Sequence, residues 1–293
     1  PAAGSGLRKR FFAPFAERHW GKDYPALAYV QDAKRGQLPS NVRVHEFYAQ
    51  AGAYMNAPPM QRDYVSVNYT RAAETIRQMD VQLIVQLVAQ RGDRYSLSCN
   101  PDLTLDVVEL YGEKPIKILG VVHPDLPFMG GDAEVGADFF AAIIHAPPHE
   151  LFALPRAPLD IVDARIGEHA AGLIEDGGTL QVGIGSLSDA VVAALIERHR
   201  TKPFVEGLYG LSEMVTDGFM HLRRAGILRR EVHDGSGAGT FLHGAFFLGS
   251  KEFYAWLRDM PEDEARGVRM TRVSKVNDLY DPDELLLRKQ RVK

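Results

Sequence analysis

The sequence predicts an α/β protein of two lobes, each built on a mainly parallel sheet covered by helices. The chain has 293 residues, whereas one hydrophobic core usually serves about 100–200 residues. Apolar strand patterns alternate with helical patterns, which is typical of parallel sheets. Pro155 and Pro158 mark a linker between two such series. We therefore predict an N-terminal lobe over residues 1–157 and a C-terminal lobe over 158–293.

The first lobe is predicted from its alternating and apolar segments. The first forty residues show no sustained period and predict irregular structure with short helices. Thr70 is a candidate N-cap for the helix that follows it. The predicted strands are 42–47, 64–67, 81–88 and 116–122, and the predicted helices are 70–79 and a short one ending at Tyr111.

The second lobe repeats the alternation, with glycines and prolines at the ends of its elements. Asp160 or Asp163 is expected to cap its first helix, and Ser186 or Ser188 its second. The predicted helices follow Asp160, cover 189–199 and 218–225, and follow Ser250. The predicted strands are 204–209, 241–248 and one that begins at 179 and runs into the glycine turn ending at 185.

Composition excludes several classes of function. Lys plus Arg (34) nearly balance Asp plus Glu (38), and no basic run suggests a nucleic-acid partner. No stretch approaches the ~20 apolar residues of a membrane span, and the N-terminus does not resemble a signal peptide. Cys99 is the only cysteine, which excludes an internal disulfide and favours a reducing compartment. We therefore predict a cytoplasmic protein with no membrane and no nucleic-acid partner.

The loop Gly183-Ile184-Gly185 is the first candidate site. It lies between a predicted strand and a predicted helix, where glycines let a ligand approach the backbone and the N–H groups of a helix N-terminus attract anions. A plain tight turn would have the same spacing. A dinucleotide-binding loop would need a third glycine at position 188, where the chain has Ser188. An NAD(P)-dependent oxidoreductase is therefore an alternative that this spacing does not favour.

Glu213 is the second candidate. It lies in Ser212–Gly218, which follows the predicted strand 204–209, and open α/β sheets bind ligands at the carboxyl ends of their strands. A solvated turn carboxylate or a helix cap is the alternative for Glu213. Asp217, nearby, could cap a helix or orient Glu213, and the helix cap is favoured.

Other candidate groups carry weaker signals. Cys99 precedes a turn and is expected to be structural. His145 and His149 bracket two prolines, which excludes the helical spacing of a zinc pair, so no metal site is predicted. No Gly-x-Ser-x-Gly elbow occurs. The loop 235–239 is not followed by the Lys-Ser/Thr pair of a phosphate-binding loop.

Several segments occur together in the order of a known family. They are Tyr95–Ser98, His123–Pro127, Ile166-Gly167, Leu173–Gly185, Ser212–Gly218, Leu222, Ala225–Ile227, Phe246–Tyr254 and Val273–Asp278. Together they resemble the acetyl-CoA hydrolase/transferase family, which includes 4-hydroxybutyrate CoA-transferases. The resemblance covers about residues 80 to 280 and implies a coenzyme A transferase fold.

The resemblance implies a function and roles for the two candidate sites. Glu213 would be the catalytic carboxylate, with Ser212 where the family has threonine, and Ile184 or Gly185 would supply an oxyanion-hole N–H. Gly183, Ile184 and Gly185 together would contact coenzyme A. The chain would then be an acyl-CoA:carboxylate CoA-transferase or an acyl-CoA hydrolase that works through a covalent glutamyl-CoA thioester. Coenzyme A and acyl-CoA would be substrates, with no permanently bound cofactor.

The resemblance also sets expectations about completeness and assembly. The family's first strand and helix and its later glycine-rich loop have no counterpart here, so we expect a chain truncated at both ends that holds the nucleophile and part of its site. A homo-oligomer is left open. A CoA-binding subunit without turnover is the non-enzymatic alternative.

Overall fold

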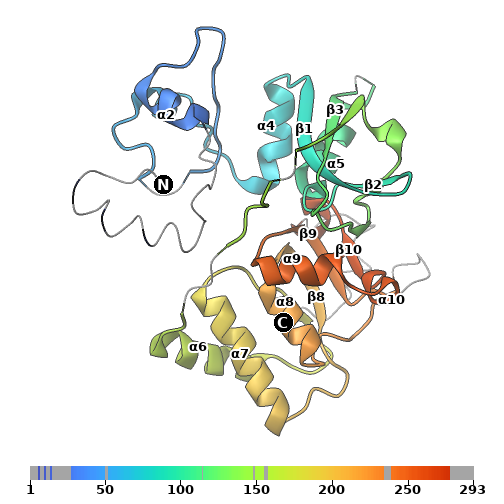
Figure 1. Cartoon of the computed structure of the whole chain (residues 1–293). Coiled ribbons are helices and arrows are strands. Elements are labelled where there is room, and N and C mark those ends of the chain that lie inside the picture. The colour runs from blue at the N-terminus through green and yellow to red at the C-terminus, as the bar shows by residue number, and fades with distance from the viewer. Residues whose placement is uncertain are drawn as a thin grey trace. The chain divides into compact units, whose positions relative to one another are not determined.

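The computed structural model describes residues 6, 10, 14, 28–49, 52–113, 115–147, 149–154, 158–233 and 239–277. The chain divides into two compact units, residues 1–69 and 70–293, and each is described by itself. Figure 1 gives the elements of both units along the chain.

The first unit is small and mostly irregular in its described part. Its helices are α2 (Ala28–Arg35) and α3 (Pro58–Arg62). Ala33, Ala57 and Met60 form its buried cluster. The predicted strands 42–47 and 64–67 are wrong: neither segment has regular secondary structure or belongs to a sheet. They share one backbone hydrogen bond, from Val65 N–H to the Glu46 carbonyl (2.8 Å), which is too little to make a ladder, and Val42, Phe47 and Tyr64 are exposed.

The second unit opens with a five-stranded sheet in the order β5-β2-β1-β3-β6. Strands β1, β3 and β6 are parallel, and β2 and β5 add antiparallel pairs. The strands are β1 (Leu83–Arg91), β2 (Arg94–Ser96), β3 (Lys117–Val122), β5 (Glu134–Val135) and β6 (Ala142–His145). The predicted strands 81–88 and 116–122 are therefore confirmed within a few residues.

Helices α4 (Ala72–Gln78) and α5 (Pro101–Tyr111) accompany this sheet. The expectation that Thr70 caps α4 is wrong, because Thr70 lies in a 3₁₀ turn, η1 (Tyr69–Arg71), and the N-cap position falls on Arg71. A second 3₁₀ turn, η2 (Ala137–Phe139), precedes β6.

The second sheet is entirely parallel, in the order β4-β10-β9-β8-β7. Its strands are β4 (Gly130–Gly131), β7 (Thr179–Leu180), β8 (Tyr209–Val215), β9 (Leu242–Phe247) and β10 (Val268–Met270). β4 precedes the first sheet's strand β5 in sequence by only two residues, 132 and 133, yet it pairs with β10. The chain therefore passes from one sheet to the other at Asp132 and Ala133.

The helices of this part include two with side-chain caps. The Asp160 carboxylate accepts the Asp163 N–H (2.8 Å) at α6, and Ser250 accepts the Phe253 N–H (3.1 Å) at α9. The helices are α6 (Ile161–Leu173), α7 (Ser186–Thr201), α8 (Asp217–Arg224), α9 (Lys251–Arg258), α10 (Glu262–Ala265) and α11 (Val273–Asn277). In Figure 1, α6 and α7 lie side by side. The expected serine cap of α7 is wrong, because Gly185 is its N-cap and no side chain caps it.

The predicted strand 204–209 is displaced in the structure. The Asp176 carboxylate accepts the backbone N–H groups of Val205, Glu206 and Gly207, which holds this segment as a bend. Because those N–H groups are taken by a side chain, they cannot join a ladder, and the strand begins only at Tyr209. Ser212 and Glu213 therefore lie within β8 rather than after it.

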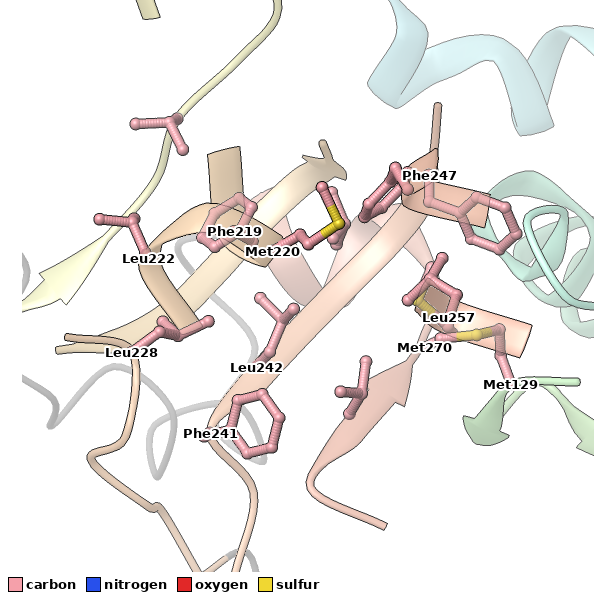
Figure 2. Packing of buried hydrophobic residues seen from close by; sticks show 14 of the residues in the cluster. Met129, Phe219, Met220, Leu222, Leu228, Phe241, Leu242, Phe247, Leu257 and Met270 are labelled. Carbon is pink, nitrogen blue, oxygen red and sulfur yellow. The ribbon is translucent and has the colours of Figure 1, made fainter. Parts of the chain in front are cut away.

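One hydrophobic cluster joins the two sheets. It includes Val88 and Ile118 from the first sheet and Leu242 and Met270 from the second. Figure 2 shows Met129, which precedes β4, next to Met270 of β10 and Leu257 of α9. The observed α/β architecture, with mainly parallel sheets covered by helices, confirms the predicted fold class.

Candidate active site

Glu213 lies near the carboxyl end of β8 and is partly buried. Side chains alternate along a strand, so Glu213 points away from the face that holds Ser212. The Ser212 hydroxyl donates to the carbonyls of Met214 (2.8 Å) and Val182 (3.2 Å). The second contact ties β8 to the residue just before Gly183. Glu213 thus lies on an interior strand whose neighbouring residue, Ser212, contacts the start of the glycine loop.

Asn277 is the described partner of the Glu213 carboxylate. Its side-chain Nδ2 donates to Glu213 Oε2, although 64 residues separate the two positions. Asn277 ends the short helix α11, which also contacts β8 and β9. The hydrogen bond restrains Oε2, and within the described residues no hydrogen bond engages the other oxygen, Oε1, which is the candidate reacting atom.

Gly183, Ile184 and Gly185 line a pocket of about 220 Å³ at the carboxyl ends of β7, β8 and β9. Thr216 and Asp217, after β8, and Leu248 and Gly249, after β9, complete much of its wall. The loop therefore lies where parallel sheets bind ligands, next to the N-terminus of α7.

Gly185 is needed for the shape of this loop. Its φ is +115° and its ψ is 166°, a conformation essentially restricted to glycine. A Cβ at this position would have no atom within 4 Å, so the restriction comes from the backbone and not from packing. Gly183 has no such conformation, and a Cβ there would lie 3.9 Å from Ser188 Oγ.

Asp217 organises the wall opposite the loop. It is the first residue of α8 and is almost fully buried. Its carboxylate accepts the Ser250 N–H (2.9 Å) and the Ser250 hydroxyl (2.5 Å), which anchors the N-terminus of α9. The expectation that Asp217 is a helix cap is therefore wrong for its own helix, because Thr216 holds that position. A carboxylate used in this way is structural.

The structure brings only some of the predicted site residues together. Gly183, Ile184 and Gly185 share one pocket, whereas Glu213 is absent from the described residues that line it and instead contacts Asn277. Asn277 lies in Val273–Asp278, one of the segments that resemble the family, but the resemblance assigned it no role. No local pattern could have linked it to Glu213, because the contact joins two distant segments.

Cys99 does not have the surroundings of a nucleophile. Burial, with a smaller contribution from the Asp102 charge, raises the pKa of its thiol from 9.0 to about 12. A catalytic cysteine needs the opposite shift, which a cationic or helix N-terminal environment provides. The prediction that Cys99 is structural agrees with these surroundings.

The fold is shared with solved structures of known proteins. RipA from Yersinia pestis matches with a TM-score of 0.62 at 20% identity, covering 86% of this chain and 62% of that one. The 4-hydroxybutyrate CoA-transferase from Porphyromonas gingivalis matches with a TM-score of 0.59 at 24% identity, covering 85% of this chain and 61% of that one. The fold is therefore coenzyme A transferase-like, as predicted.

Sequence comparison gives the same class. The chain is 29% identical over 210 residues to the 4-hydroxybutyrate coenzyme A transferase of Clostridium kluyveri, covering 70% of this chain and 46% of the relative. It is 26% identical over 206 residues to the succinyl-CoA:acetate/propanoyl-CoA:succinate CoA transferase of Fasciola hepatica, covering 68% and 40%. No family model matches the chain.

These curated homologues are CoA transferases, which confirms the resemblance inferred from the motifs. The chain spans about half the length of the curated relatives it matches. Within the described residues, no helix has both the length and the apolar character needed to cross a membrane.

Proposed function

We propose that the protein is an acyl-CoA:carboxylate CoA-transferase in which Glu213 carries coenzyme A as a covalent thioester. The observation that carries the proposal is a partly buried carboxylate on an interior strand, oriented by the Asn277 amide, in a chain whose homologues are CoA transferases. The substrates would be an acyl-CoA and a carboxylic acid, with no permanently bound cofactor.

In the first step, Glu213 Oε1 attacks the thioester carbonyl carbon of the acyl-CoA. The carbon–sulfur bond breaks, and the products are a mixed anhydride on Glu213 and the CoA thiolate. A carboxylate is a weak nucleophile, so this step depends on positioning and on donors aimed at the developing oxyanion. Asn277, bound to the other carboxylate oxygen, supplies the positioning.

In the second step, the CoA thiolate attacks the glutamyl carbonyl of the anhydride. The first carboxylic acid leaves as its carboxylate, and Glu213 becomes a CoA thioester. A second carboxylate then reverses both steps and leaves as a new acyl-CoA. No proton or electron is gained or lost over the cycle.

Gly183, Ile184 and Gly185 are proposed to contact coenzyme A, and the N–H of Ile184 or Gly185 is proposed to bind an oxyanion. Support comes from their place at the carboxyl ends of the strands and from the open backbone at Gly185. Removing an oxyanion donor typically slows turnover by about 10²–10³-fold.

The outcome of the cycle depends on what reaches the glutamyl thioester. If water is excluded, a carboxylate closes the cycle and the protein is a transferase; if water enters, it is a hydrolase. The homologues named above favour the transferase and give no support to an oxidoreductase. A cytoplasmic location, lobes that divide at 157/158 and a homo-oligomer stay predictions.

The test is mass spectrometry of the peptide that carries Glu213 after incubation of the purified protein with acyl-CoAs. We expect a CoA-linked adduct on that peptide, and Glu213→Gln is expected to remove both the adduct and turnover. Glu197→Gln is a matched control, because Glu197 pairs with Arg200 in an exposed ion pair on α7. Such a pair contributes about 0–1 kcal/mol to stability.

Three results are decisive. Full turnover in Glu213→Gln would overturn the assignment. Tight CoA binding without any adduct would favour the binding subunit without turnover. Binding of NAD in preference to coenzyme A would favour the oxidoreductase.

A further inference from the structure

The helix that presents Asn277 to Glu213 is too short to hold itself in place. α11 has five residues, and isolated helices shorter than about 12–15 residues are marginal in water. Val273 is its buried residue. Tertiary contacts must therefore fix where the Asn277 amide points.

Asp106, on α5, meets the start of α11. Its carboxylate accepts the Ser274 hydroxyl (2.6 Å) and the Ser274 N–H (3.3 Å). The Arg272 guanidinium lies 3.7 Å from the same carboxylate and also pairs with Glu109. The Asp106 side chain is only 13% exposed, so these contacts are little screened by solvent.

Asp132, where the chain crosses between the sheets, meets the same segment from another side. Its Oδ2 accepts the Thr271 hydroxyl (2.6 Å) and lies 3.1 Å from Lys275 Nζ. The Thr271 N–H donates to the Gly244 carbonyl of β9 (2.8 Å). The segment from Thr271 to Lys275 is thus tied both to the second sheet and to a carboxylate from the first half of the chain.

We propose that Asp106 and Asp132 are positioning residues that hold α11 so that the Asn277 amide orients the Glu213 carboxylate. The proposal rests on the proposed role of Glu213. Both carboxylates belong to the N-terminal half of the sequence, and both bind residues within six positions of Asn277. The first half of the chain thereby sets the geometry of a nucleophile in the second half.

The arrangement favours positioning over simple stabilisation. Residues 271, 274 and 275 make these hydrogen bonds, and all three lie in one short segment. That segment ends at Asn277, the residue that contacts Glu213. A misplacement of about 1 Å at a reacting group can slow an enzyme by about 100-fold. Loosening α11 should therefore slow the chemical step more than it weakens substrate binding.

The test measures how fast the CoA adduct forms on Glu213 in a single turnover of the purified protein. We expect Asp106→Asn and Asp132→Asn to slow adduct formation by about 10-fold or more, with the Kd for coenzyme A changed by less than about threefold. Ser274→Ala removes the hydroxyl that donates to Asp106, and it should also slow adduct formation. Glu113→Gln is the matched control, since it removes an exposed carboxylate just beyond α5.

A double-mutant cycle with Asn277→Ala separates positioning from structure. If Asp106 acts through Asn277, Asp106→Asn should slow adduct formation little further once Asn277 is alanine. Multiplicative rate losses in the double variant, or wild-type rates in both Asp106→Asn and Ser274→Ala, would overturn the inference. A wild-type protein that never forms the adduct would instead overturn the proposed function.

Discussion

Replacing Gly185 by alanine tests whether the loop beside the proposed site depends on its backbone shape. Gly185 has a φ of +115°, and nothing lies within 4 Å of a Cβ added there, so the cost comes from the backbone alone. Such a conformation costs a residue with a side chain roughly 1–3 kcal/mol. Gly183→Ala is the internal comparison, because an added Cβ would make only an ordinary 3.9 Å contact with Ser188 Oγ.

The two variants should separate in an unfolding experiment. Alanine stabilises through the unfolded state by about 0.4–1 kcal/mol at either position, so this effect cancels, and the difference between the two variants should be the backbone cost of about 1–3 kcal/mol. That corresponds to a gap in Tm on the order of 5–10 °C, which thermal unfolding by circular dichroism resolves. Equal Tm values, or a lower value for Gly183→Ala, would refute the argument.

Two further predictions follow from shifted pKa values. Burial raises the pKa of Cys99 to about 12, so the thiol should resist alkylation in the folded protein at mildly alkaline pH, and Cys99→Ala should form the Glu213 adduct normally. Because the unfolded thiol ionises near 9.0, its contribution to stability should be lost as the pH rises from there toward 12. Burial acts to raise the pKa of Asp176, but backbone N–H donors from Glu206, Val205, Gly207 and Gly177 outweigh it and lower the pKa from 3.8. Asp176→Asn should therefore cost about 1–3 kcal/mol at neutral pH. Denaturant unfolding at several pH values should show that cost shrinking as the pH falls below 3.8; a cost that does not change with pH would contradict the assignment.

The elements with strong local patterns could be predicted from the sequence. The apolar run at 81–88 became β1, the middle strand of its sheet, and Val88 and Ala89 bury its C-terminal part in the core. Asp160 caps α6 as expected, since an N-cap depends on atoms only three residues apart. The predicted strands at 42–47 and 64–67 are wrong because an alternating pattern is compatible with a strand but does not show that a second strand lies beside it to pair with.

The strand before Glu213 shows why boundaries were harder to predict. Residues 204–209 have the composition of a strand, but Asp176 takes the N–H groups of three of them. Asp176 itself lies about 30 positions earlier, in a turn that the sequence marks only as the end of a helix. A side chain that competes for backbone donors from such a distance leaves no periodic signal.

The site shows the same limit on a larger scale. Glu213 and the glycine loop could be found because each belongs to a contiguous motif, whereas the hydrogen bond from Asn277 joins residues 64 positions apart. The contact of Asp106 with Ser274 joins residues 168 positions apart. A change at Asp106 should therefore alter the chemistry of Glu213 without touching any residue of the motif that identified it.

The path of the chain through Asp132 gives this coupling a structural basis. β4 pairs with β10 in the second sheet, and β5, just after it, pairs with β2 in the first. Asp132 lies at that crossing and binds Thr271, the residue that follows β10. Because Asp132 lies in the short segment that joins both sheets, a displacement of the first sheet relative to the second would move its contact with Thr271. The segment from Thr271 to Asn277 would then be displaced as well. The orientation of the Glu213 carboxylate is thus tied to how the two sheets pack, which no contiguous motif encodes.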